Sequence, residues 1–235
     1  MRVLLFAPVL LAATAAPVVS PAIRAALADP ARADQAGDDE RRQAAAVLAF
    51  AGVRPGQTVV DYLPGQGYWT RIFAGVVGPQ GHVVAMWPQA AAKRADGVVS
   101  GLKARGLTNV AYDVQATNLP TVAAPVDLFW TVQNYHDIPD PLKAQFNQAI
   151  YNALRPGGVY VVIDHADTVN APPTVPFKHR IDPHVVRAQV TAAGFRFAGE
   201  SKVLANPADD HSLPVFDPSL RGHTDQFVYK FVRPR

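Results

Sequence analysis

The chain has 235 residues, of which 49% are hydrophobic and 17% charged, so it can bury one sizeable core and is not disordered by composition. Its 22 Lys and Arg against 19 Asp and Glu give a net charge of +3, scattered along the chain, which argues against nucleic-acid binding. The absence of Cys excludes disulfides, thiolate catalysis and Cys-ligated metal centres.

The N-terminus has the pattern of a secretory signal peptide. Arg2 precedes an apolar run from Val3 to Ala12, and a run of about ten residues fits a signal peptide but is too short to cross a bilayer. Small residues follow, so we expect residues 1–15 to be removed and the protein to be exported, to the periplasm, without stable membrane insertion. The alternative is an apolar N-terminal helix packed on the core.

The rest of the chain is predicted to form one domain behind a leader. Residues 16–37, rich in Ala, Pro and Asp, predict a flexible tether, and residues 38–235 predict the domain. The predicted helices span 40–51, 68–77, 90–104, 141–154 and 182–193, and the predicted strands span 58–62, 82–86, 110–114, 126–132, 159–164, 195–204 and 227–232. Strands separated by helices are typical of an α/β fold with a doubly wound parallel sheet.

The turn after the first predicted strand carries the strongest ligand signal. The strand ends at Asp61, and Gly65 and Gly67 precede the next helix. Glycines let a ligand approach the backbone closely, and the start of a helix points N–H groups at it. A tight strand-to-helix turn without a ligand is the alternative.

Four short passages of the sequence, one of them this turn, together resemble a known superfamily. They are Val53–Gly56 before the strand ending in Asp61, the turn Pro64–Thr70, Leu154–Gly158 before a strand, and Ala193–Phe195 before the last two strands. Over residues 52–234 the sequence resembles the class I S-adenosylmethionine (SAM)-dependent methyltransferases, in particular an exported bacterial group. The resemblance implies a Rossmann-like fold with seven strands and an antiparallel C-terminal strand, SAM as cofactor, and Asp61, Gly65 and Gly67 around its methionine moiety.

Three positions depart from the superfamily pattern. Leu63 stands where a further glycine is usual, and the second strand runs into Trp87 without the acid that receives the ribose hydroxyls. Trp87 is expected either to stack on adenine or to pack in the core. Gln115 stands where an acidic residue often contacts adenine, and it keeps the capacity to form hydrogen bonds.

Polar residues follow the strand at 126–132, where such folds place acceptor-binding and catalytic groups. His136 is a candidate general base, and a neighbouring carboxylate such as Asp137 is expected to orient its ring. Asn134 and Tyr135 are candidate substrate-binding residues. The alternative is a polar loop that satisfies its own backbone.

Asp164 and His165 end the next strand and are expected to face the same cleft as further catalytic candidates. Two imidazoles and a carboxylate can bind a metal. Because no spacing enforces a metal site, none is predicted at His136, Asp164 and His165. Asp182 and Pro183 predict the N-cap and first turn of a helix.

The long polar segment 205–225 predicts either a lid over the cleft or a surface loop tied by Asx turns. Under the first interpretation Asp210 and His211 contact substrate.

These features predict SAM-dependent methyl transfer to a small molecule in the cell envelope. A non-catalytic small-ligand-binding protein with the same fold is the second interpretation, favoured by Leu63 and the missing acid. Metal-assisted hydrolysis is the third.

Overall fold

The computed structural model describes residues 18–172 and 177–235. The predicted signal peptide, residues 1–15, lies outside the described residues. The strands are β1 (Thr58–Tyr62), β2 (His82–Trp87), β3 (Val110–Val114), β4 (Val126–Val132), β5 (Leu154–His165), β6 (Arg196–Ser201) and β7 (Gln226–Val232). The α-helices are α1 (Pro21–Leu27), α2 (Ala44–Ala51), α3 (Tyr68–Val77), α4 (Ala92–Lys103), α5 (Asp140–Ala153) and α6 (Pro183–Ala192).

All seven strands form one sheet in the order β3-β2-β1-β4-β5-β7-β6. Strands β1 to β5 pair in parallel, whereas β7 runs antiparallel to both β5 and β6. The predicted α/β fold with an antiparallel C-terminal strand is therefore confirmed. The direction of strand addition reverses between β1 and β4, and ligands of doubly wound sheets bind beyond the carboxyl ends of the strands at such a point.

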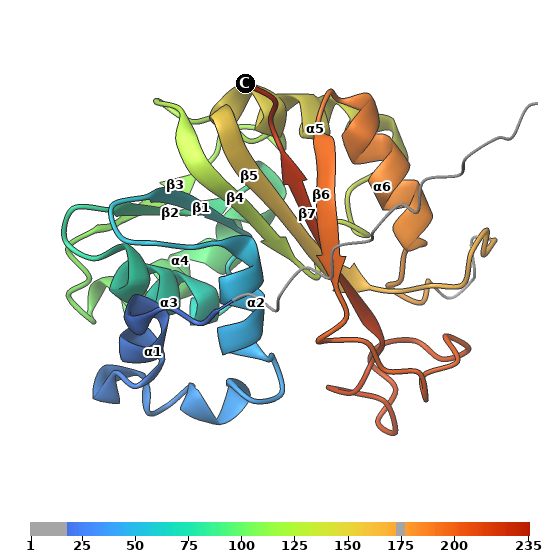
Figure 1. Cartoon of the computed structure of the whole chain (residues 1–235), viewed down its shortest axis with the longest axis horizontal. Coiled ribbons are helices and arrows are strands. Elements are labelled where there is room, and N and C mark those ends of the chain that lie inside the picture. Colours follow the sequence, from blue (N-terminus) through green and yellow to red (C-terminus); the bar gives the residue numbers. More distant parts are fainter. Residues whose placement is uncertain (1–17, 173–176) are drawn as a thin grey trace, which may run out of the picture.

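Alternate residues of the strands supply the two faces of the sheet. On one face Val59, Leu128 and Trp130 pack against α1, α2 and α3, and α4 covers the same face near β2. On the other face Val60 and Phe129 pack against α5 and α6. Figure 1 shows α1, α2 and α3 on one side of the sheet and α5 and α6 on the other. Both faces are buried, which explains why the parallel strands read as nearly continuous apolar runs.

Residues 18–37, the described part of the segment predicted as a flexible tether, instead contain helices that pack on the domain. Helix α1 buries Ile23 and Ala26 against α3, and short 3-10 helices follow at Pro30–Arg32 and Ala36–Asp38. Arg32 is almost fully buried and pairs with Asp39 at 2.7 Å. The Ala and Pro content of this segment did not predict helix α1, because the apolar contacts of α1 are made with α3, which is distant in sequence.

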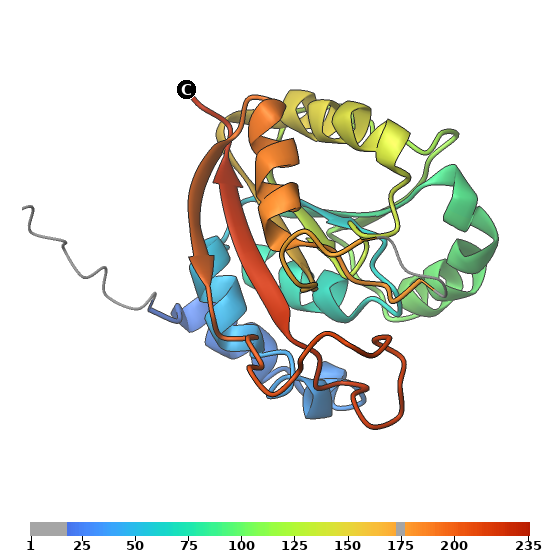
Figure 2. The ribbon, with the colours of Figure 1, turned by 90° about the vertical axis from the view of Figure 1, so that its right-hand side faces the viewer.

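The segment between β6 and β7, residues 202–225, contains neither helix nor strand. Figure 2 shows this loop beside the N-terminal helices. None of the helices in the described part of the chain combines the length and hydropathy that a membrane crossing requires.

Candidate cofactor and acceptor site

A cavity of about 660 Å³ lies at the carboxyl ends of β1, β2 and β4. This is within the size range of small-molecule and cofactor sites. Its wall consists of Tyr62, Leu63, Gly65, Gln66, Trp87, Pro88, Ala90, Ala91, Arg94, Val98, Asn118, Leu119, Asn134, Asp137, Ile138, Pro139, Leu142 and Phe146.

The two glycines of the turn after β1 have different roles. Gly65 lines the cavity with φ 55°, and a Cβ added there would meet no heavy atom within 4 Å. Gly67 is buried with φ 76°, and an added Cβ would lie 2.5 Å from Cδ2 of Leu102. Gly65 therefore leaves open space at the cavity wall, whereas Gly67 allows α3 to pack closely against α4.

Helix α3 begins at this turn without a capping side chain at its N-cap position, and Asp61 of β1 binds its first turn instead. Its N-cap residue is Gly67, which has a left-handed conformation and accepts no side-chain hydrogen bond. The first N–H groups of a helix have no partner within it, and they attract anionic groups. The turn thus provides open space at the cavity wall, and the expectation that the N–H groups of α3 face a ligand stays a prediction.

Asp61 lies beneath the turn and is absent from the cavity wall. It is 2% exposed and accepts a 2.6 Å hydrogen bond from Oγ1 of Thr70, the third residue of α3. Burial raises the pKa of Asp61 to about 7, although the Thr70 hydrogen bonds oppose this rise. Asp61 therefore acts on the cavity only through the helix start that it holds.

The residues that depart from the superfamily pattern also take defined places. Leu63 lines the cavity with φ 54°, and its N–H donates to Met86 O at 2.8 Å. Trp87 is buried against α4 and lines the cavity too, so its two predicted roles are compatible. Gln115 is outside the cavity wall and instead hydrogen-bonds Asp113 and Thr121.

The loop after β4 divides the candidate substrate-binding residues. Asn134 lines the cavity, and its Nδ2 donates to Tyr62 O at 3.2 Å. Tyr135 is fully buried, donates to Gln189 at 3.0 Å and accepts from Asn147 at 2.7 Å. Tyr135 is thus directed toward the contact between α5 and α6, away from the cavity.

His136 and Asp164 form a buried pair between the loop after β4 and the end of β5. Asp164 is fully buried, and its Oδ1 lies 2.6 Å from His136 Nδ1. It also accepts the backbone N–H of His136 at 2.9 Å and that of His165 at 2.8 Å. Burial disfavours the imidazolium, but the carboxylates of Asp164 and Asp137 outweigh it and raise the pKa of His136. Asp164 thus fixes the ring and leaves Nε2 directed outward.

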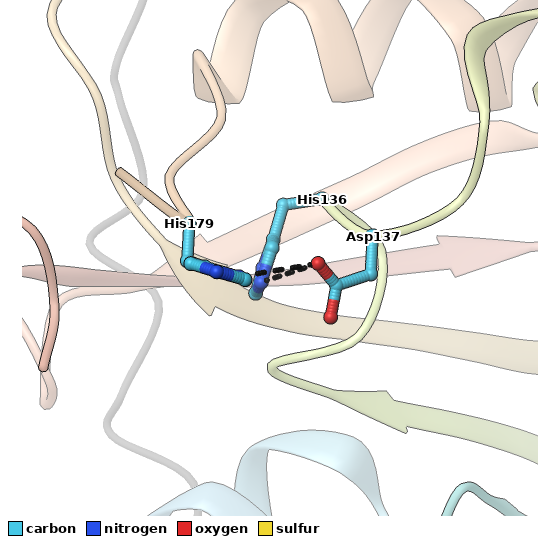
Figure 3. A group of neighbouring side chains, drawn as sticks. All are labelled: His136, Asp137 and His179. Atoms are coloured by element: carbon cyan, nitrogen blue, oxygen red, sulfur yellow. Dashed lines mark ion pairs between the residues drawn. The ribbon is translucent and has the colours of Figure 1, made fainter. Parts of the chain in front are cut away.

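Asp164, and not Asp137 as the sequence predicts, orients the His136 ring, while Asp137 and His179 form a cluster beside Nε2 of His136. Oδ1 of Asp137 lies 3.4 Å from Nε2 of His136 and 3.2 Å from Nδ1 of His179 (Figure 3). Asp137 also lines the cavity, so the cluster borders it. His179 comes from the segment before α6, and no sequence spacing links it to His136; only the adjacency of Asp137 to His136 was a usable signal.

The other predicted residues stand apart from this cavity. His165 binds Oγ1 of Thr224 through Nδ1 at 2.7 Å, and burial lowers the pKa of His165 to about 4. Asp210 accepts from the backbone of Ser212, and His211 Nε2 lies 3.0 Å from Asp225. The loop 202–225 reaches the histidine cluster through Phe216, whose ring centroid is 4.9 Å from that of His179.

The lid interpretation of this loop is not favoured by its internal contacts. Asp209 is buried and forms two hydrogen bonds with the Arg180 guanidinium, at 2.9 and 3.0 Å. Asp209 also accepts the backbone N–H groups of His211 and Asp225. These contacts tie the loop to the segment before α6, which agrees with the alternative of a surface loop held by Asx turns.

The strand order and a cavity over a glycine turn after β1 together define the class I SAM-dependent methyltransferase fold, and the chain has this fold. A SAM-dependent methyltransferase from Aquifex aeolicus superposes with a TM-score of 0.59 at 19% identity, covering 89% of this chain and 96% of that one. The [4+2]-cyclase SpnF superposes with a TM-score of 0.64 at 17% identity, covering 88% of this chain and 85% of that one.

Comparison by sequence reaches one curated methyltransferase. The arsenite methyltransferase of Halobacterium salinarum is 29% identical over 148 residues, which is 62% of this chain. The match covers 35% of that protein, so this chain corresponds to about a third of its length. No protein-family model matches the chain.

Proposed function

We propose that the protein binds SAM in the cavity and transfers its methyl group to a small-molecule acceptor beside His136 and Asp137. The observation that carries this proposal is the position of the cavity. One end lies on the glycine turn between β1 and α3, and Asp137 of the histidine cluster lines the same cavity. The sequence match to a methyltransferase supports the same activity.

The cavity residues fit this cofactor. Gly65 leaves room that any larger residue would fill, and the first N–H groups of α3 not bound by Asp61 would donate to a carboxylate such as that of the methionine moiety. Trp87 supplies an apolar aromatic wall at the end of β2, where it would contact the adenosine end. When bound, the sulfonium supplies an already activated methyl group.

The protein's own residues would align the acceptor and take up its proton. An acceptor oxygen or nitrogen that took the methyl group in exchange for the carbon–sulfur bond would lose a proton, which the protein would have to accept. Nε2 of His136 lies on the side of Asp137, which lines the cavity, and Asp164 holds the ring through Nδ1. Alignment and proton removal are the two contributions such a reaction requires of the protein.

We do not propose the acceptor named for the curated relative as the acceptor of this protein. That protein is named for arsenite. Thiolates are the side chains suited to soft centres, and this chain has no Cys. An acceptor in the cell envelope remains our proposal, and it is supported by the apolar run after Arg2.

Titration calorimetry of the purified protein with SAM and S-adenosylhomocysteine tests cofactor binding. We expect a dissociation constant in the micromolar range, about −8 kcal/mol. Absence of binding at about millimolar ligand would overturn the proposal. It would then favour a non-catalytic protein for a different small ligand.

A non-catalytic protein that binds a small ligand is the second candidate, and one observation favours it. Among the residues that the structure describes, no carboxylate lines the cavity at the end of β2, where Trp87 stands. The same fold also occurs in a protein named as a [4+2]-cyclase, so the fold is not confined to methyl transfer. Fold alone does not determine chemistry. Transfer of isotope-labelled methyl from SAM to a panel of hydroxyl and amine acceptors distinguishes the two roles.

Replacement His136→Ala is expected to leave SAM binding within about twofold and to lower methyl transfer by about 10²-fold, the usual contribution of a positioned proton acceptor. The reason is that His136 does not line the cavity but directs Nε2 to its acceptor side. The labelled-methyl assay and calorimetry measure the two quantities.

His165→Ala is the matched comparison for this prediction, since His165 is also buried and only its backbone N–H, which the variant keeps, donates to Asp164. Its Nδ1 is bound to Thr224, so we expect a smaller effect on transfer. Equal losses in both variants at equal thermal stability would contradict the assignment of His136.

A further inference from the structure

The three ligand atoms of the histidine cluster are close enough to share one cation. Two imidazole nitrogens and one carboxylate oxygen, from His136, Asp137 and His179, lie within 4.8 Å of one another. Two of the separations are 3.2 and 3.4 Å, both measured to Oδ1 of Asp137. Neighbouring ligands in a tetrahedral site with bonds of about 2.0–2.1 Å are about 3.3 Å apart.

These separations are not those of ordinary hydrogen-bonded pairs. Within the described part of the chain, neither imidazole forms a hydrogen bond with Asp137, although both nitrogens are within ion-pair distance of its Oδ1. The ring nitrogens therefore do not point directly at the oxygen. Neither lone pair is then engaged by Asp137, and three ligand atoms at these separations can share one cation.

The partner of His136 supports the same interpretation. Asp164 accepts the Nδ1 hydrogen of His136 at 2.6 Å, which leaves the lone pair on Nε2. Metal-binding histidines almost always donate their other ring N–H to a carboxylate or carbonyl, and this contact orients the ring. The buried carboxylate thus prepares His136 to bind through Nε2, the atom on the side of Asp137 and His179.

We propose that His136 Nε2, Asp137 and His179 Nδ1 bind a divalent transition-metal cation, with zinc as the best match. Two imidazoles with one carboxylate favour this class over magnesium or calcium, which prefer oxygen ligands. Three protein ligands leave a coordination position open, the arrangement of catalytic rather than structural sites. These ligands differ from His136, Asp164 and His165, the group considered from the sequence. Nδ1 of His165 is hydrogen-bonded to Thr224, and Asp164 orients His136 instead of binding the cation.

The surroundings of the cluster allow a cation to enter from solvent and keep it next to the cavity. The side chains of Asp137 and His179 are 53% and 32% exposed, while that of His136 is 4% exposed. The rings of Phe177 and Phe216 flank His179, with centroids 4.8 and 4.9 Å away. Asp137 lines the cavity, so the open position would border it.

One consequence rests on the proposed function. A lone pair that binds a cation cannot also accept a proton. In the metal-bound protein the cation would therefore replace His136 as the activating group, by binding the acceptor oxygen and lowering its pKa.

Competition between the metal-stripped protein and a chromogenic zinc chelator tests the site. We expect one zinc per chain with a dissociation constant of about 1 μM or tighter. His179→Ala and Asp137→Asn should each weaken binding at least tenfold. Both side chains are partly exposed, so the variants are expected to fold, and circular dichroism with thermal melting checks this. His82→Ala removes an exposed histidine at the start of β2 and should leave zinc affinity unchanged.

Zinc binding that is absent, or equally tight in His179→Ala and the unsubstituted protein, would overturn the site. Displacement of zinc by equimolar magnesium would overturn the metal class. SAM binding is measured separately by calorimetry on the unsubstituted protein. If zinc binding fails and SAM binding is intact, the metal site alone is rejected. If zinc binds and SAM does not, methyl transfer alone is rejected.

Discussion

Replacement of Gly65 by Val is expected to abolish SAM binding, with a loss of at least about 10³-fold, or about 4 kcal/mol. Gly65 lines the cavity, and its missing side chain leaves open space at the wall. A valine would occupy that space. Its β-branched side chain is also strained at φ 55°, in the left-handed region that favours glycine. Calorimetry with S-adenosylhomocysteine measures the loss.

The matched control for this prediction is Gly106→Val. Gly106 has φ 69°, and an added Cβ there meets no heavy atom within 4 Å, so the variant bears the same kind of backbone strain. Gly106 is not part of the cavity wall. We expect both variants to lose comparable stability and only Gly65→Val to lose affinity. Unchanged affinity in folded Gly65→Val would remove the cofactor site from this turn.

Replacement of Asp61 by Asn is expected to stabilise the protein at pH 8 by up to about 4 kcal/mol and to change its stability little at pH 4. Burial raises the pKa of Asp61 to about 7, whereas an unfolded chain has a value of about 3.9. The folded state therefore holds this proton more tightly, and the corresponding stability is lost as the pH rises from about 4 to about 7. Asn keeps an oxygen for the Thr70 hydroxyl and cannot ionise.

Urea denaturation at several pH values between 4 and 8 checks this prediction. Asp96→Asn, on an exposed position of α4, serves as the control and should leave the pH profile unchanged. If Asp61→Asn destabilised the protein equally at every pH, then ionised Asp61 would be part of the stable fold. Such a result would contradict the raised pKa.

Local signals in the sequence are sufficient for the order of elements. The apolar strand runs predict β1 and β4, and Asp182 with Pro183 predicts the start of α6, where the Asp182 side chain accepts from His184 N–H. Gly65 and Gly67 predict the turn after β1, because only residues without a Cβ adopt its left-handed conformations easily. These features depend on neighbours within a few residues, which is why they could be predicted.

Contacts between segments distant in sequence decided which of the predicted site residues border the cavity and how the N-terminal segment folds. The sequence placed Asp61, Gly65 and Gly67 together at the cofactor, but packing directs Asp61 to Thr70 and Gly67 to Leu102, and only Gly65 borders the cavity. Part of the predicted tether forms helix α1, because Ile23 packs against an apolar surface of α3.

The candidate acceptor site shows the same division most clearly. The sequence by itself determined a parallel α/β sheet, a glycine turn after β1 and a polar loop containing His136. Only the tertiary structure brought His179 to Asp137 and His136, and only it assigned His165 to Thr224. The physical reason is that these side chains come from separate loops, and the strand order and packing of the folded sheet set the distances between them.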